Sequence, residues 1–186
     1  MLHLVVVAYV ACFAGGVTLV VVSALAARHL ALPTLREFAI LVAAFTLILL
    51  AEAARTYQSA VGVDFGAGLD IAAVLLSVAG NLGVGWYLPT VALTVVRAEP
   101  SRARSLLLAV LASTVGLLGG LRAASFLLWP AVAAALVRWS FGLVALAAVH
   151  VLAGGILLAG FHRIQHARLQ LVIRTFLIYL GVFAVL

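Results

Sequence analysis

The sequence predicts an all-α fold, a polytopic bundle of about six membrane-spanning helices. Hydrophobic residues make up 67% of the 186 positions, charged residues make up only 9%, and the mean hydropathy is +1.35. Such values exclude an ordinary soluble domain. Several windows of about 20 residues carry no charge, and this is the length of helix that crosses a bilayer. A membrane β-barrel is excluded because its strands would show short alternating segments instead of continuous apolar runs.

The first two spans are predicted at about residues 2–27 and 37–57. The first apolar run ends at Arg28, and a short turn with Pro33 leads to the second span, which Arg36 opens. A signal peptide is not expected, because the N-terminus lacks a positively charged region and the first run is long enough to span the bilayer.

The third and fourth spans are predicted at about residues 69–96 and 105–128. A glycine-rich loop precedes the third span, and Arg97 opens the basic connection that follows it. Trp129 and Pro130 end the fourth span. Proline cannot continue a helix without losing a hydrogen bond, and tryptophan is enriched at the level of the lipid headgroups.

The fifth and sixth spans are predicted at about residues 132–161 and 169–186. The fifth run is longer than a bilayer requires, so we expect it to tilt or to project from the membrane. In the sixth, the apolar tail from Thr175 to Leu186 would form roughly 18 Å of helix, against a hydrocarbon core of about 30 Å. We therefore expect the chain to be the membrane part of a longer protein with a seventh span.

The distribution of arginine predicts the orientation of the chain. All eleven basic side chains are arginine, and cytoplasmic connections are the ones enriched in Arg and Lys. An outside N-terminus places eight arginines on the cytoplasmic side and three near the outer boundary. The cytoplasmic eight are Arg28, Arg36, Arg97, Arg102, Arg104, Arg163, Arg168 and Arg174. The outer three are Arg55, Arg122 and Arg138. We expect the chain in the bacterial cytoplasmic membrane, with its N-terminus outside and the lipid bilayer as its partner.

Four polar residues inside the spans are candidates for binding a ligand, because charged groups within a membrane are costly. Glu52 and Arg55, three residues apart in the outer half of the second span, either pair with each other or line an outward-facing pocket. Asn81 and His150 fall near the bilayer midplane, where they either form interhelical hydrogen bonds or line a ligand cavity. The cavity would lie between the second, third and fifth spans.

One segment of the third span is a candidate hinge. It contains Gly80, Gly83 and Gly85, and Pro89 follows. Glycine lowers the propensity for helix, and proline removes a backbone hydrogen bond. The segment is therefore the predicted element that changes shape when a ligand binds, although glycines within spans also serve close helix packing.

Several kinds of chemistry are not expected. The absence of lysine excludes a retinal Schiff base. A haem held by two histidines would need a second midplane histidine beside His150, and His162 with His166 are too few ligands for a metal site. The Gly-x-Ser-Gly signature of rhomboid proteases is missing around Ser113. We expect neither catalytic residues nor a cofactor or metal, and the scattered arginines do not predict direct nucleic-acid binding.

Three segments carry a resemblance to known proteins: Arg28-His29-Leu30-Ala31-Leu32-Pro33, Gly85-Trp86-Tyr87-Leu88-Pro89 and the basic stretch from Arg168 to Arg174. Over its whole length the chain resembles the seven-span N-terminal membrane regions of bacterial signalling proteins. These are seven-helix sensor histidine kinases and membrane-anchored LuxR-type helix-turn-helix regulators. The resemblance implies an input domain that senses a small or lipophilic external ligand and relays the signal to a cytoplasmic output domain. It carries over no ligand residues, and the seventh span and the output domain are missing from this chain.

The leading interpretation is a non-enzymatic receptor or sensor module that binds a small or lipophilic ligand. A substrate-binding membrane subunit of a transporter, similar to the S-component of energy-coupling-factor systems, is the first alternative. A structural subunit of a larger membrane complex is the second. A homodimer is compatible with each of them.

Overall fold

A computed structural model of the chain describes residues 2–30, 33–62, 66–96, 101–127, 129 and 141–161, together with residues 170, 174, 177 and 178. These residues form five principal helices and no strand, which confirms the all-α class. The helices are α1 (Leu2–Leu30), α2 (Pro33–Val61), α3 (Ala67–Val95), α4 (Arg102–Leu127) and α6 (Phe141–Gly160).

Four of these helices, α1 to α4, are long and apolar enough to cross a membrane. A helix of 29 residues, the length of α1, α2 and α3, extends about 43 Å and exceeds the roughly 30 Å of a hydrocarbon core. The helical membrane class is therefore supported. The predicted count of six spans is not, since the apolar part of α6 is a shorter stretch, Val144–Gly160. Most of the predicted sixth span, 169–186, lies outside the described residues.

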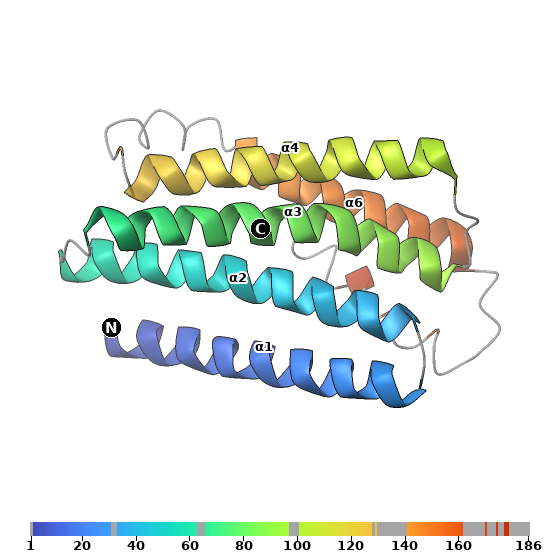
Figure 1. The fold of residues 1–186 in the computed structure, drawn as a ribbon, viewed down its shortest axis with the longest axis horizontal. Coiled ribbons are helices and arrows are strands. Elements are labelled where there is room, and N and C mark those ends of the chain that lie inside the picture. Colours follow the sequence, from blue (N-terminus) through green and yellow to red (C-terminus); the bar gives the residue numbers. More distant parts are fainter. Residues whose placement is uncertain are drawn as a thin grey trace.

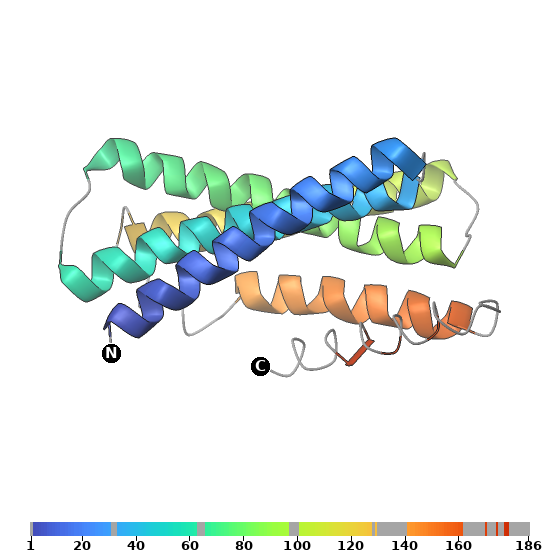
Figure 2. The ribbon, with the colours of Figure 1, turned by 90° about the horizontal axis from the view of Figure 1, so that it is seen from below.

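Helix α3 is the centre of the bundle. Helices α2 and α4 flank it, α6 packs against both α3 and α4, and α1 packs against α2 (Figure 1). Figure 2 shows α1 crossing α2 obliquely, with α6 along one edge of the bundle. Helices α2 and α4 run in the same direction, and α1, α3 and α6 run in the opposite one. The close packing of α3 with three neighbours makes it the element through which the other helices are coupled.

The core is apolar and lies where α2, α4 and α6 pack against α3. Val84 and Leu88 of α3, Val115 of α4 and Val149 of α6 are fully buried. Lipid tails are as apolar as these side chains, so van der Waals packing contributes more to helix association here than water exclusion does. The tight fit of these residues therefore determines how α3, α4 and α6 are arranged.

The glycines of α3 allow its neighbours to approach closely. A Cβ atom on Gly80 would lie 2.7 Å from the backbone oxygen of Ala44 in α2, and one on Gly85 would lie 2.7 Å from the Cα atom of Ala112 in α4. Real Cβ atoms essentially never come this close to backbone atoms. The absence of a side chain at these positions sets the helix spacing.

The predicted hinge segment lies within a continuous helix, because α3 is unbroken from Ala67 to Val95 and includes Pro89. Proline lacks the N–H group that would bond the carbonyl four residues earlier, which in α3 belongs to Gly85. Next to it, the Thr90 hydroxyl donates a hydrogen bond of 2.6 Å to the carbonyl of Trp86. Packing against neighbouring helices and serine or threonine side chains makes proline tolerable in membrane helices. The hinge role remains a prediction.

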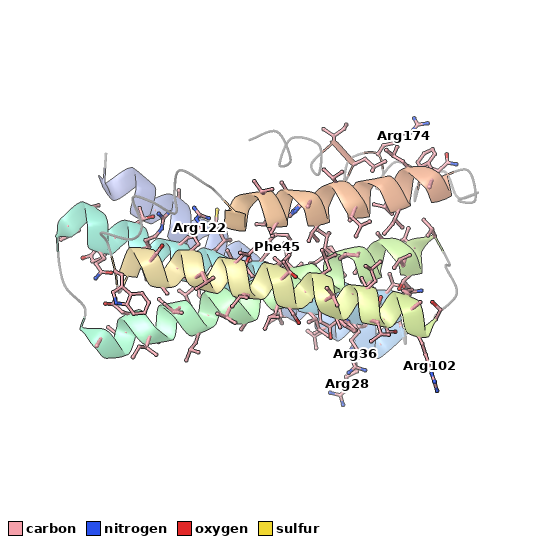
Figure 3. The ribbon with its side chains drawn as sticks, turned by 90° about the horizontal axis from the view of Figure 1, so that it is seen from above. Arg28, Arg36, Phe45, Arg102, Arg122 and Arg174 are labelled. Atoms are coloured by element: carbon pink, nitrogen blue, oxygen red, sulfur yellow. The ribbon has the colours of Figure 1, made fainter. Side chains whose placement is uncertain are left out.

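Arginine side chains mark the two ends of the bundle. Arg28, Arg36, Arg102 and Arg174 lie toward the end where α1 finishes and α2 begins, and Arg122 lies toward the opposite end (Figure 3). We call the first the arginine-rich end. There, the Thr94 hydroxyl of α3 donates a 2.9 Å hydrogen bond to the Glu37 carboxylate of α2.

Candidate functional site

An ionic cluster joins α2 to α4 at the end of the bundle opposite the arginine-rich end. Its members are Glu52 and Arg55 of α2 and Arg122 of α4. We call it the outer ionic cluster, because the sequence predicts that this end of the bundle lies outside. The Arg55 Nη2 atom donates a hydrogen bond of 2.5 Å to Oε2 of Glu52. The Arg122 Nη1 atom lies 3.7 Å from the other carboxylate oxygen, Oε1. One carboxylate therefore faces two guanidinium groups from two helices.

Helix geometry explains why these residues meet. Glu52 and Arg55 are three positions apart and so lie on the same face of α2. Glu52 stands 19 residues after the start of α2 and Arg122 stands 20 residues after the start of α4. Because both helices run away from the arginine-rich end, each residue lies about 30 Å from the start of its helix. Arg122 is thus brought to the same level as Glu52.

The outer ionic cluster is half-buried. The exposed fractions of the side chains are 27% for Glu52, 27% for Arg55 and 31% for Arg122. About 30 Å of helix, roughly the thickness of a hydrocarbon core, separates them from the arginine-rich end. Arginine there can keep its guanidinium group at the interface while its apolar stem lies along the helices. The cluster therefore remains reachable from outside the bundle.

Asn81 lies in the interface between α3 and α4. Its Nδ2 atom donates hydrogen bonds to the backbone oxygen of Ser77, at 2.8 Å, and to the Ser77 hydroxyl, at 3.3 Å. The Ser77 hydroxyl in turn donates a 3.3 Å bond to the carbonyl of Gly119 in α4. A side chain on Gly119 would collide with the Asn81 carboxamide. The arrangement is an interhelical hydrogen-bond network, one of the two roles predicted for Asn81.

His150 is fully buried in α6. Its Nδ1 atom lies 2.7 Å from the carbonyl oxygen of Leu146, one turn earlier in the same helix. The imidazole meets the Phe45 ring of α2 edge-on, with the ring centroids 6.0 Å apart. Aromatic pairs favour this T-shaped geometry. His150 thus packs α6 against α2, and a ligand that touched it would have to displace this contact.

The four predicted ligand residues lie in three separate environments. Glu52 and Arg55 are together and form an ion pair. Asn81 is bonded within the α3–α4 interface, and His150 packs between α6 and α2. A single cavity lined by all four residues stays a prediction.

Sequence reasoning missed the partners that tertiary structure supplies. The sequence places Arg122 near the outer boundary without a partner, and the structure adds it to the outer ionic cluster. Its depth could have been compared with that of Glu52, because both residues are counted from an arginine at the same membrane surface. Gly119 and Phe45 carry no chemical signal in the sequence. Only the packing of the helices identifies them as neighbours of Ser77 and His150.

Other parts of the described structure are weaker candidates for a metal or anion site. Among the described residues, no group of three His, Cys, Asp or Glu side chains could hold a metal ion. His162 and His166 lie outside the described residues. An open depression at the arginine-rich end is lined by Ser101, Arg102, Ser105 and Leu106, all of them exposed. The outer ionic cluster is therefore the strongest candidate site.

No protein-family model, curated protein or solved structure matches this chain, so the site is interpreted from its own geometry.

Proposed function

We propose that the chain is the membrane-embedded sensor domain of a bacterial signalling protein, binding a small or lipophilic ligand from outside. The observation that carries the proposal is the outer ionic cluster, in which Glu52 of α2 contacts Arg122 of α4. Charged side chains within membrane-spanning segments are usually paired and often mark functional sites. Here they are half-exposed and link two helices, so a ligand that competes for them acts on both.

A ligand at this site can act on helix positions. Helices α2 and α4 pack mainly on α3, on either side of it. The contact between Glu52 and Arg122 therefore forms a direct bridge between α2 and α4, which otherwise contact mainly the central helix. A ligand shifts the balance between two helix arrangements only if it binds them with different affinity. Opening the bridge would change the spacing of α2 and α4, and small helix shifts are a common form of signal relay. The candidate hinge of α3, Gly80 to Pro89, lies between the two moving helices.

The proposed topology has six spans in this chain and a seventh beyond it, with the N-terminus outside the bacterial cytoplasmic membrane. Four long apolar helices support a membrane bundle. The arginine-rich end supports the orientation, because the positive-inside rule places that end in the cytoplasm. An output domain would follow the seventh span in the cytoplasm. The partners are the lipid bilayer, the ligand and, as a further proposal, a second copy of the chain. No enzymatic activity is proposed.

Binding without transport is the expected result for a sensor. We expect at least one member of a library of charged and neutral metabolites to raise the unfolding temperature of the protein in phosphatidylcholine nanodiscs, saturably with concentration, because a ligand stabilises the folded state it binds. Glu52→Gln should alter this response, and Leu117→Ala, a change of an exposed residue of α4, should not. Accumulation of the bound compound inside sealed proteoliposomes would contradict the sensor proposal and favour a transport subunit. If no compound raised the unfolding temperature, both the sensor and the transport interpretation would be contradicted.

Labelling from one side of the membrane tests the proposed orientation. In a Cys12→Ser background, which removes the single cysteine, Gly68→Cys and Ser101→Cys place one exposed thiol at opposite ends of the bundle. A membrane-impermeant maleimide applied to intact spheroplasts should label the first and reach the second only after lysis. The opposite pattern would place the N-terminus in the cytoplasm and would contradict the positive-inside assignment.

A further inference from the structure

An open depression lies at the beginning of α4, at the arginine-rich end of the bundle. It is lined by Ser101, Arg102, Ser105 and Leu106, and we call it the α4 depression. We infer that it binds the headgroup of an anionic phospholipid, whose acyl chain follows an exposed apolar face of α4. This inference goes beyond the proposed function, because it holds equally for a sensor, a transport subunit and a structural subunit.

The α4 depression has room for a headgroup and presents a positive charge to it. Its volume of about 590 Å³ lies within the roughly 300–1,000 Å³ of ligand pockets. The Arg102 side chain extends away from the bundle (Figure 3). Within the described part of the chain, its guanidinium group has no hydrogen bond or ion pair. A guanidinium group is always charged, and its paired donors match the oxygens of a phosphate.

Serine hydroxyls order the first turn of α4 before a lipid arrives. The Ser101 hydroxyl accepts a 3.2 Å hydrogen bond from the backbone N–H of Arg104, and so caps the helix. The Ser105 hydroxyl donates a 3.2 Å hydrogen bond to the carbonyl of Ser101. The Ser101 hydroxyl keeps its own hydrogen to donate to a phosphate oxygen. Because this turn is already formed, binding does not have to order it, which lowers the cost of binding.

An apolar stripe continues along α4 from the depression toward the middle of the bundle. Leu106, Val110 and Leu117 are 68%, 66% and 64% exposed. Together with Arg102 they lie within about 80° of the helix circumference, since each residue advances by about 100°. The helix rises about 16 Å from Leu106 to Leu117, roughly half of a 30 Å hydrocarbon core. The charge and the stripe therefore match the headgroup and the acyl chain of a lipid in one leaflet.

The open form of the α4 depression favours a lipid over a soluble anion. Its four lining residues are all exposed, whereas ligand pockets usually bury most of the surface of a soluble ligand. A phospholipid needs no such enclosure, because the bilayer surrounds its chains. Arg28 and Arg36 extend toward the same side of the bundle as Arg102 (Figure 3). This positive charge attracts an anionic headgroup more strongly than a zwitterionic one.

The experiment compares an anionic with a zwitterionic lipid on the purified protein. Native mass spectrometry of the protein in detergent micelles is titrated with phosphatidylglycerol and with phosphatidylcholine. We expect tighter retention of phosphatidylglycerol. Arg102→Gln should weaken the affinity for phosphatidylglycerol about tenfold, because a hydrogen bond to a charged group is lost. Arg102→Lys, which keeps the charge but not the planar fork, should give an intermediate affinity.

Two control variants separate a site from a general attraction between charges or between apolar surfaces. Arg174 lies at the same end of the bundle but on the other side of it, with its guanidinium group 5.6 Å from the centroid of the Phe161 ring (Figure 3). Arg174→Gln should leave the affinity for phosphatidylglycerol unchanged. Leu106→Asn should weaken it, and Leu158→Asn, at an exposed leucine of α6, should not.

Three results would overturn the inference: equal retention of the two lipids by the natural chain, equal weakening in Arg102→Gln and Arg174→Gln, or equal affinities of Leu106→Asn and Leu158→Asn. Should Arg102→Gln fail to fold, the comparison of the two leucine variants still decides the question. Inorganic phosphate is tested separately, by thermal unfolding in phosphatidylcholine nanodiscs. A rise in unfolding temperature that depends on Arg102 would assign the α4 depression to a soluble anion, and the lipid proposed here would be wrong.

Discussion

Gly85→Val is expected to destabilise the bundle severely, because α3 and α4 would have to separate. A Cβ atom at this position would lie 2.7 Å from the Cα atom of Ala112 and 3.4 Å from its backbone nitrogen. The obstacle is helix backbone, which cannot rotate away as a flexible side chain does. Overpacking typically costs about 1–3 kcal/mol and occasionally more, and a backbone clash belongs at the upper end of that range. The free energy of unfolding can be measured by denaturant titration in mixed micelles.

Gly15→Val provides the matched control. Gly15 is also an interior helical glycine, in α1, but a Cβ atom there would have nothing within 4 Å. The intrinsic change in helix propensity is the same at both sites, so the difference between the two variants isolates the α3–α4 contact. Equal stability of the two variants would show that Gly85 does not set the helix spacing.

His150→Ala is expected to produce the second large loss of stability. The side chain is fully buried, touches the Phe45 ring and bonds the Leu146 carbonyl. Truncating a large buried side chain to alanine leaves a cavity and usually costs roughly 2–5 kcal/mol. We expect the unfolding temperature to fall strongly, and contact between α6 and α2 to weaken.

Val151→Ala is the control for this variant, because Val151 is the next residue of α6 and its side chain is 62% exposed. It should unfold close to the natural chain. Comparing His150→Ala with Val151→Ala also distinguishes a packing role of His150 from a ligand-binding role. If His150→Ala unfolded like Val151→Ala but lost ligand binding, the histidine would be a ligand residue and its packing role would be minor.

The pattern of apolar runs was enough to predict the class and most helix positions. The predicted spans 37–57, 69–96 and 105–128 each lie largely inside an observed helix. Helix ends were less accurate, since α2 extends from Pro33 to Val61 and so is longer at both ends. The ends are harder to predict because a helix can continue past the hydrocarbon core through charged residues such as Arg36. Composition no longer indicates a membrane helix in that region.

The candidate site was predictable only in part. Glu52 and Arg55 are neighbours along one helix, so their spacing predicted an ion pair as one of two roles, and the structure contains that pair. Arg122 belongs to α4, which is separated in the sequence from α2 by the whole of α3. Its approach to Glu52 depends on how α2 and α4 are arranged around α3, and no local pattern encodes that arrangement.

The sequence by itself determined that this protein is a helical membrane bundle, because about 20 uncharged apolar residues in a row are stable in a bilayer only as helix. It also predicted that most arginines lie at one end, where the structure places Arg28, Arg36, Arg102 and Arg174. The tertiary structure alone decided which helices touch, and hence that Asn81 bonds within the α3–α4 interface while His150 packs against Phe45. The reason is that lipid offers every apolar face an equal environment. Helix partners are therefore selected by shape, by glycines such as Gly85 and by a few polar contacts.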